Sequence, residues 1–252
     1  MLIDERHKKI IEILKKEKII STKKLAKLLF FSEATLRRDL IKMEQKGILQ
    51  RTRGGASILE SFANESSILI REQKQIQEKR RIALKCFELL KDNTSFFVDS
   101  SSTVGSLLYY FQNFENITVI TNSLNNCSIL TKTTKAAVYL TPGLVDQKTN
   151  SLLGSDTIEY IKNFYCNVFL FSCSGLSLHG ISEANSEQSL IKREMLKHSK
   201  THILLVDHTK FNKNYLSLSY GFEDIDYIIT DKLPDSAYIK LFQENKTKLI
   251  IA

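Results

Sequence analysis

The chain has 252 residues, of which 25% are charged and 42% are hydrophobic, a composition typical of a globular protein. No apolar run approaches the ~18 residues that a membrane-spanning helix needs. The mixed charges of residues 1–16 exclude a signal or transit peptide, so we expect a cytoplasmic protein.

The charge is unevenly distributed along the chain. Residues 1–57 hold 15 Lys and Arg against 7 Asp and Glu, so the whole formal net charge of +8 lies in this segment. A small basic segment joined to a neutral one indicates a polyanionic partner at one end only. A solvated lysine-rich face without any partner is the alternative interpretation.

The first 57 residues are predicted to fold as a winged helix-turn-helix domain. Apolar residues recur with helical spacing, and residues that can cap a helix stand before each run. The helices are predicted over 4–17, 22–29 and 33–46, with a connector over 18–20 and a strand over 48–53. The caps are predicted at Ser21 or Thr22, at Ser32 and at Gly47. Gly54 and Gly55 suit the tight turn of a wing.

The third predicted helix has the two faces that a recognition helix needs. At about 100° per residue, Leu36, Leu40 and Met43 share one face, which leaves a basic, hydrogen-bonding face for the major groove. Asp39 lies within the basic cluster, and we expect it to pair with a neighbouring arginine rather than to contact DNA. An arginine-rich bundle that binds protein is the alternative. The residues predicted to contact DNA, from this helix and the wing, are Ser32, Ala34, Thr35, Arg37, Arg38, Lys42, Arg51, Arg53, Gly54 and Gly55.

The pattern changes after residue 57. Residues 58–74 are predicted to be a partly helical linker, and residues 75–252 to form an α/β domain with a doubly wound, mostly parallel sheet. Helices are predicted over 75–91, 103–111, 124–131, 154–163, 185–199 and 236–244. Strands are predicted over 95–98, 117–120, 136–140, 168–171, 203–206, 227–229 and 249–251.

Polar clusters follow five of these predicted strands. In open parallel sheets ligands bind outside the carboxyl ends of the strands, and hydroxyls with free backbone N–H groups favour phosphate. Lys210 could add a point charge, while Asp99 and Asn122 could bond sugar hydroxyls. Each cluster by itself is also explained by local helix capping. The residues predicted to bind an effector are Asp99, Ser100, Ser101, Ser102, Thr103, Thr121, Asn122, Ser123, Gly143, Gly175, Glu183, Asp207 and Lys210.

The four cysteines do not indicate a metal site. They form no C-x-x-C pair and no cluster with histidine at metal-ligand spacing, so we expect buried free thiols, no metal and no cofactor. They are Cys86, Cys127, Cys166 and Cys173.

Several motifs resemble the DeoR family of bacterial regulators. Residues 32–40, S-E-A-T-L-R-R-D-L, resemble the family's S-x-x-T-[IV]-R-R-D-L, and residues 51–56, R-T-R-G-G-A, its R-x-x-G-G-A. Further matches are residues 99–103 to D-S-G-T-T, 121–123 to T-N-S, 175–184 to G…G-[LI]…E-A, 207–211 to D-x-[ST]-K-F and 225–231 to D-x-[VI]-I-T-D.

The resemblance implies a sensor domain similar in fold to ribose-5-phosphate isomerase and glucosamine-6-phosphate deaminase, with a phosphorylated sugar as effector. It also implies a repressor of a sugar-metabolism operon that binds double-stranded operator DNA as a homo-oligomer, a dimer or a tetramer. Two departures predict an altered effector site: Ser101 replaces a glycine, and Thr141-Pro142-Gly143 replaces a usual L-G-G.

Two alternatives remain at this stage. The first is an isomerase- or deaminase-like enzyme that uses Asp99, Glu183, Asp207, His208 and Lys210 as acid and base. The second is a regulator whose α/β domain only oligomerises. We predict no enzyme, because a metabolic enzyme has no need of a basic winged helix and the chain has no G-x-S-x-G motif.

Overall fold

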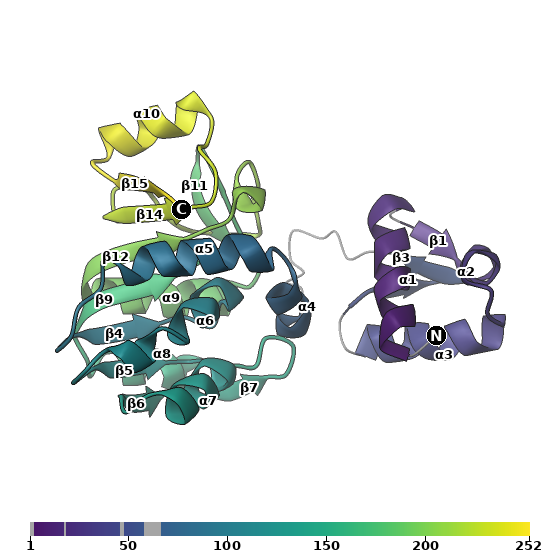
Figure 1. The fold of residues 1–252 in the computed structure, drawn as a ribbon, viewed down its shortest axis with the longest axis horizontal. Coiled ribbons are helices and arrows are strands. Elements are labelled where there is room, and N and C mark those ends of the chain that lie inside the picture. Colours follow the sequence, from purple (N-terminus) through teal and green to yellow (C-terminus); the bar gives the residue numbers. More distant parts are fainter. Residues whose placement is uncertain (1–2, 18, 46–47, 58–66) are drawn as a thin grey trace. The chain divides into compact units, whose positions relative to one another are not determined.

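A computed structural model describes residues 3–17, 19–45, 48–57 and 67–252 of the protein. The chain divides into two compact units, residues 1–70 and 71–252 (Figure 1). The predicted C-cap Gly47 and most of the predicted linker lie outside the described residues. Within the described ranges, no helix combines the length and apolar character needed to cross a membrane.

The N-terminal unit consists of three helices and a small antiparallel sheet. The helices are α1 (Ile3–Glu17), α2 (Thr22–Leu29) and α3 (Glu33–Gln45), which confirms the prediction. The strands β1 (Ile19–Ser21), β2 (Gln50–Thr52) and β3 (Gly55–Ser57) form a sheet in the order β1-β3-β2. The predicted connector is therefore wrong, since Ile19 and Ile20 begin a strand that pairs with the wing.

Local chemistry explains where these elements begin and turn. The Ser21 hydroxyl accepts from the Lys24 amide at 3.2 Å and caps α2. Gly54 has a φ of +88°, as the tight turn between β2 and β3 requires. At Gly55 a side chain would collide with the backbone of Ile20, so only glycine lets β1 approach β3 this closely.

The C-terminal unit is built on a seven-stranded sheet in which every strand is parallel to its neighbours. Its order is β15-β14-β12-β9-β4-β5-β6. The strands are β4 (Ser95–Val98), β5 (Thr118–Thr121), β6 (Ala137–Leu140), β9 (Cys166–Phe171), β12 (Ser199–Leu205), β14 (Tyr227–Thr230) and β15 (Lys248–Ile251). The helices are α5 (Ile76–Phe87), α6 (Ser102–Leu108), α7 (Leu124–Thr133), α8 (Ser155–Ile161), α9 (Ser186–Lys197) and α10 (Ser236–Glu244), with α4 (Ile68–Gln73) before them.

Helices cover both faces of this sheet, as predicted for a doubly wound domain. Successive residues of β4 show the alternation: Phe96 and Val98 pack with α5, α6 and α7, whereas Phe97 packs with α8, α9 and α10. The chain builds outward from β4 through β5 and β6, then returns to place β9 on the other side of β4. This reversal creates a switch point where β4 and β9 end.

Two smaller sheets were not predicted. A hairpin of β7 (Leu144–Asp146) and β8 (Ser151–Leu153) stands beside β5, and β10 (Gly175–Ser177), β11 (Gly180–Glu183) and β13 (Ser217–Tyr220) form an antiparallel sheet. Each of these strands has only three or four residues, too few to show a period, and β10, β11 and β13 are also rich in Gly and Ser. Tertiary pairing overrides such weak local preference.

Candidate DNA interface and effector site

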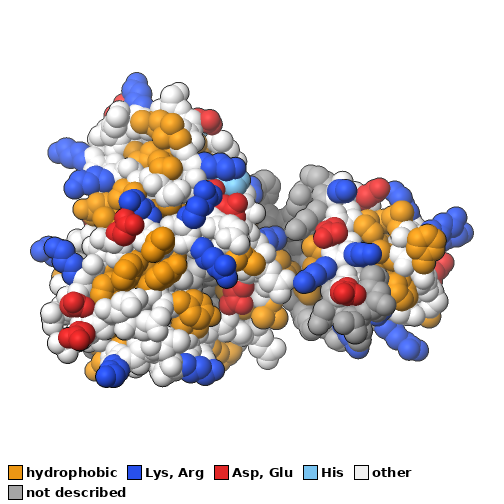
Figure 2. Space-filling view, in the orientation of Figure 1, with side chains coloured by type: hydrophobic (Ala, Val, Ile, Leu, Met, Phe, Trp, Pro, Cys, Tyr) orange, Lys and Arg blue, Asp and Glu red, His pale blue; other side chains and the backbone are white. Residues whose placement is uncertain are grey.

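The outward face of α3 carries the predicted DNA-binding side chains. Leu36, Leu40 and Met43 are buried, as predicted, and so fix which face of the helix is turned outward. Of the ten residues predicted to contact DNA, Gly55 is buried and Thr35 half-buried, and the others are exposed: Ser32, Ala34, Arg37, Arg38, Lys42, Arg51, Arg53 and Gly54. Lys and Arg side chains stand out from the surface of this unit (Figure 2).

The ends of α3 are fixed to their surroundings. The Ser32 hydroxyl accepts from the Thr35 amide at 3.2 Å, as expected of an N-cap. Near the other end, the Glu44 carboxylate accepts from the Arg51 amide at 2.8 Å, which joins the helix to the wing. The Glu44 side chain thus connects the recognition helix to the wing, in addition to the chain segment between them.

Asp39 does not pair with a neighbouring arginine, and that expectation was wrong. Its partner is Arg6 on α1, whose Nε donates to Oδ2 at 2.5 Å and whose Nη2 donates to Oδ1 at 3.1 Å. His7 Nε2 lies 3.3 Å from the same Oδ1. Burial would raise the pKa of Asp39, but the hydrogen bonds from Arg6 and His7 outweigh it and hold that pKa below its usual value. Helix geometry turns Asp39 inward, beside the buried face, so arginines adjacent in sequence cannot reach it.

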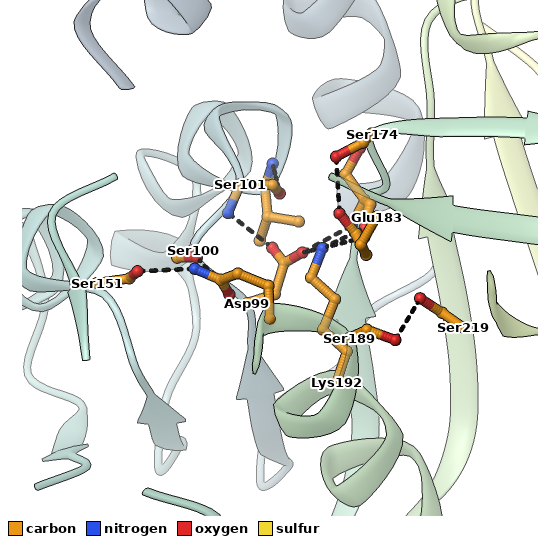
Figure 3. A network of polar contacts seen from close by, with 12 residues as sticks. Asp99, Ser100, Ser101, Ser151, Ser174, Glu183, Ser189, Lys192 and Ser219 are labelled. Carbon is orange, nitrogen blue, oxygen red and sulfur yellow. Dashed lines mark hydrogen bonds and ion pairs between the residues drawn. The ribbon is translucent and has the colours of Figure 1, made fainter. Parts of the chain in front are cut away.

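A charged network occupies the switch point of the large sheet (Figure 3). The Asp99 carboxylate accepts from the Ser101 and Ser172 amides, each at 2.9 Å, and its Oδ2 lies 3.0 Å from Lys192 Nζ. The Glu183 carboxylate accepts from Lys192 Nζ at 2.6 Å and from the Ser174 hydroxyl at 2.8 Å. Both acids, predicted to bind an effector, are thus occupied by partners within the protein.

Lys192, on α9, is the residue of this network that the sequence analysis missed. It is 5% exposed and also donates to the Ser172 carbonyl at 2.7 Å. Burial alone would lower the pKa of Lys192, but the carboxylates of Glu183 and Asp99 raise it well above its usual value. No local pattern sets Lys192 apart from the other lysines of the sequence, because the burial of this side of α9 is known only from the structure.

A second cationic cluster lies where the chain enters α5 and α6. The Lys79 ammonium donates to the Arg71 carbonyl and, at 3.0 Å, to the Ser102 hydroxyl. Lys79 is 4% exposed. Burial, with the nearby charge of Lys210, lowers the pKa of Lys79 to about 8. Lys210 Nζ lies 3.5 Å from the Ser174 carbonyl, so it reaches toward the switch point. Lys210 was predicted to bind the effector from the sequence, whereas Lys79 and Arg71 were not.

Three of the predicted effector residues act as helix caps. Ser101 caps α6 through the Val104 amide at 3.3 Å, and Ser123 caps α7 through the Asn126 amide at 3.2 Å. Asp207 accepts from the Thr209 amide at 2.9 Å at the start of a short 3-10 helix, His208–Lys210. Ser101, which replaces a glycine of the resembling motif, has a φ of −80° and so needs no glycine here.

Asn122 differs from these caps. Its amide nitrogen donates to the Leu152 carbonyl at 3.2 Å, yet its buried Oδ1 has no hydrogen-bond partner within the described part of the chain. An orphaned buried acceptor is rare in proteins and marks a place where a ligand group could bind. Thr121, just before it, accepts from the Ser123 amide at 3.2 Å.

The remaining predicted residues lie around the same edge. Ser100 and Thr103 are buried, and the Ser100 hydroxyl donates to Gln188 at 3.3 Å. Gly143 follows Pro142, whose carbonyl accepts from Thr157 at 2.6 Å, and Gly175 begins β10. Because β4, β5, β6, β9 and β12 are parallel neighbours, the polar segments that follow them share one edge of the sheet.

The cysteines are free thiols in this fold. Cys86, Cys166 and Cys173 are buried and Cys127 is half-buried. Burial raises the pKa of the Cys166 thiol to about 12, which makes it unreactive. Among the described residues no group of three or more potential ligands could hold a metal ion.

A winged helix-turn-helix joined to a parallel α/β unit with a polar carboxyl edge defines a class of DNA-binding regulators with an attached sensor domain. Comparison with known proteins agrees: residues 6–62 match the DeoR-like helix-turn-helix domain and residues 74–232 the DeoR C-terminal sensor domain. The chain belongs to the DeoR family of transcriptional regulators.

Relatives match over almost the whole chain. The transcriptional repressor GlcR of Bacillus subtilis (strain 168) is 32% identical over 251 residues, which is 100% of this chain and 97% of the relative. The glycerol-3-phosphate regulon repressor of Escherichia coli (strain K12) is 26% identical over 246 residues, 97% of each chain. Among solved structures, ribose 5-phosphate isomerase A of Methanocaldococcus jannaschii is similar with a TM-score of 0.41 and 10% identity over 55% of each chain.

Proposed function

We propose that this DeoR-family regulator represses a sugar-metabolism operon, and that a phosphorylated sugar bound at the carboxyl edge of the large sheet changes its affinity for operator DNA. The observation that carries the proposal is the position of buried Lys79 beside Lys210 and Ser102. Burial and the second ammonium both disfavour the charged form of Lys79. A phosphate dianion bound there would offset both effects.

The same cluster supplies the hydrogen bonds that a phosphate needs. The Ser102 oxygen accepts from Lys79, so its own hydroxyl hydrogen remains available to a phosphate oxygen. Lys210 adds a second point charge, and the Arg71 carbonyl holds the Lys79 ammonium in place. We assign the phosphate of the effector to this corner.

The sugar end of the effector would lie over the neighbouring strands. Asn122 follows β5, next to β4 at a spacing of about 4.8 Å, and its Oδ1 lacks a donor. A sugar hydroxyl would supply that donor, whereas an unmet buried acceptor costs about 1–3 kcal/mol. We propose that Asp99 and Glu183 support the site through Lys192 and do not bind the ligand.

The engaged acids also argue against catalysis. An enzyme of this architecture needs an acid and a base that can exchange protons with substrate. Asp99 and Glu183 are committed to Lys192, and Asp207 caps the segment that carries Lys210. We therefore expect binding without turnover of sugar phosphates.

Regulation of this kind works through an oligomer. Two or more winged helices bind repeated half-sites, and the effector favours one of two arrangements of these heads. We expect a homo-oligomer, a dimer or a tetramer, and its mass in solution can be measured directly by light scattering.

The decisive experiment is a titration of operator DNA with the full chain, with and without a panel of sugar phosphates. The operator is first selected by the protein from random duplexes. We expect one phosphate to change DNA affinity by about 5–150-fold, the range of ordinary coupling free energies.

Single substitutions test where the effector binds. Lys79→Met and Lys210→Met should bind DNA normally and lose the response to the effector, while Lys85→Met, an exposed lysine on the same helix α5, should keep it. If no phosphorylated sugar alters DNA affinity, the sensor proposal fails, and a domain that only oligomerises becomes the better explanation. Turnover of any sugar phosphate by the purified protein would contradict the non-enzymatic assignment.

A further inference from the structure

Arg6 holds the recognition helix at two separate points. Its guanidinium forms the two hydrogen bonds to Asp39, in the middle of α3, and stacks over the ring of Phe31 at 4.7 Å from the ring centre. Phe31 directly precedes Ser32, the N-cap of α3. One side chain of α1 therefore contacts both the turn that leads into α3 and the middle of the helix.

The pair is buried at both ends. Arg6 and Asp39 are 8% and 4% exposed, so neither is available to a DNA groove or phosphate. A bidentate guanidinium–carboxylate pair has a fixed planar geometry, unlike the apolar contacts around it, which permit small rotations of a helix. Arg38 is the residue next to Asp39 on the same helix.

We propose that Arg6 and Asp39 are positioning residues for DNA recognition: the pair fixes the rotation of α3 about its own axis and so aims Arg38 and Lys42 at the base edges. Compared with an apolar pair of similar volume, this ion pair contributes specificity rather than stability. Buried ion pairs replaced by apolar side chains of similar volume often leave stability unchanged or increased. Retention of such a pair in a small domain is consistent with a requirement for one defined orientation.

A double substitution separates positioning from folding. Arg6→Met combined with Asp39→Met removes both charges of the pair together, so neither is left buried without the other, and the formal net charge of the domain is unchanged. The full chain is titrated against two DNA probes at several salt concentrations: the duplex that the wild-type protein selects from a random pool, and a duplex of unrelated sequence. Thermal unfolding is measured in parallel. Glu159→Met combined with Lys162→Met, an exposed ion pair of the C-terminal unit, is the matched control.

We expect the double variant to unfold at or above the wild-type temperature and to bind the selected duplex about 10-fold more weakly, the scale of one lost base contact. Affinity for the unrelated duplex, and the dependence of affinity on salt, should stay unchanged because no phosphate contact is removed. A folded double variant with wild-type preference for the selected duplex would overturn the proposal.

A second variant keeps the proposal testable if the double variant fails to fold. Arg6→Lys retains a buried positive charge for Asp39 and loses the planar fork and much of the stacking on Phe31. We expect it to fold and to lose several-fold preference for the selected duplex. If Arg6→Lys keeps the full wild-type preference for the selected duplex, the planar guanidinium does not orient α3 and the proposal is overturned.

Discussion

Lys192 Nζ lies 2.6 Å from Glu183 Oε1 and 3.0 Å from Asp99 Oδ2, at the point where the order of the large sheet reverses. These three side chains come from α9, from β11 and from the end of β4. A single buried ammonium thus joins the main sheet, the small antiparallel sheet and the helix packed against them. These contacts fix the three elements to one another at the carboxyl edge of the sheet.

Replacement of Lys192 should destabilise the protein strongly. Lys192→Met leaves two buried carboxylates without a counter-charge, and loss of one partner of a buried pair costs about 3–5 kcal/mol. Denaturant unfolding of the full chain measures this change. Lys197→Met, which removes the exposed partner of Glu194 on the same helix, should change the free energy of unfolding by less than about 1 kcal/mol. Equal effects of the two substitutions would contradict the assignment.

Phosphate binding should depend on the protonation of Lys79. The pKa of this lysine is lowered to about 8, so above that pH the free protein loses the charge that a bound phosphate needs. Binding then requires proton uptake, and affinity for inorganic phosphate should fall by about 10-fold per pH unit above pH 8. Calorimetric titrations between pH 7 and 10 measure the slope.

Lys79→Arg is the matched control for that experiment, because a guanidinium keeps its charge throughout this range. Its phosphate affinity should be lower overall, since the geometry differs, but flat between pH 7 and 9. A wild-type profile without a break near pH 8 would mean that Lys79 does not bind the phosphate.

The Asp39 carboxylate should make the stability of the protein sensitive to acid. Its pKa is lower in the folded state than the ordinary value of 3.8, so its contribution is fully present above pH 3.8 and is lost as pH falls through the folded-state value. Circular dichroism during acid titration should show the N-terminal helices melting at a higher pH in Asp39→Asn. An identical acid transition in both proteins would count against a net stabilising charge at this site.

The two glycines of the wing should respond differently to alanine. Gly55→Ala would force a side chain into the backbone of Ile20, separate β1 from β3, and lower both stability, by about 1–3 kcal/mol, and DNA affinity. Gly54→Ala meets open space and suffers only the strain of its positive φ, about 1 kcal/mol. Unfolding and DNA titration of the two variants measure these losses. A larger loss in Gly54→Ala than in Gly55→Ala would contradict the prediction.

Local sequence determined the main helices, the strands of the large sheet and their general arrangement, but not the short strands of the smaller sheets. Periodic apolar residues predicted the helices of both units and all seven strands of the large sheet, with ends displaced by up to four residues. The strand over 95–98 was predicted with its observed bounds because Phe96, Phe97 and Val98 form an apolar run, as expected of a strand buried on both faces of a sheet. Parallel strands place their carboxyl ends together, so the polar edge of the sheet also followed from sequence. The family motifs lie on these same elements.

Tertiary structure alone decided which buried charged residues are partners. Arg6 and Asp39 are separated by 33 residues in the sequence, and Asp99 and Lys192 by 93. Nothing local distinguishes Lys79 or Lys192 among the 36 Lys and Arg of the chain. The spacing of apolar residues that predicts a helix involves residues three or four positions apart, so it can be recognised from a short stretch of sequence. The partner of a buried charge depends on which distant elements the finished core brings within about 3 Å, the range of a hydrogen bond.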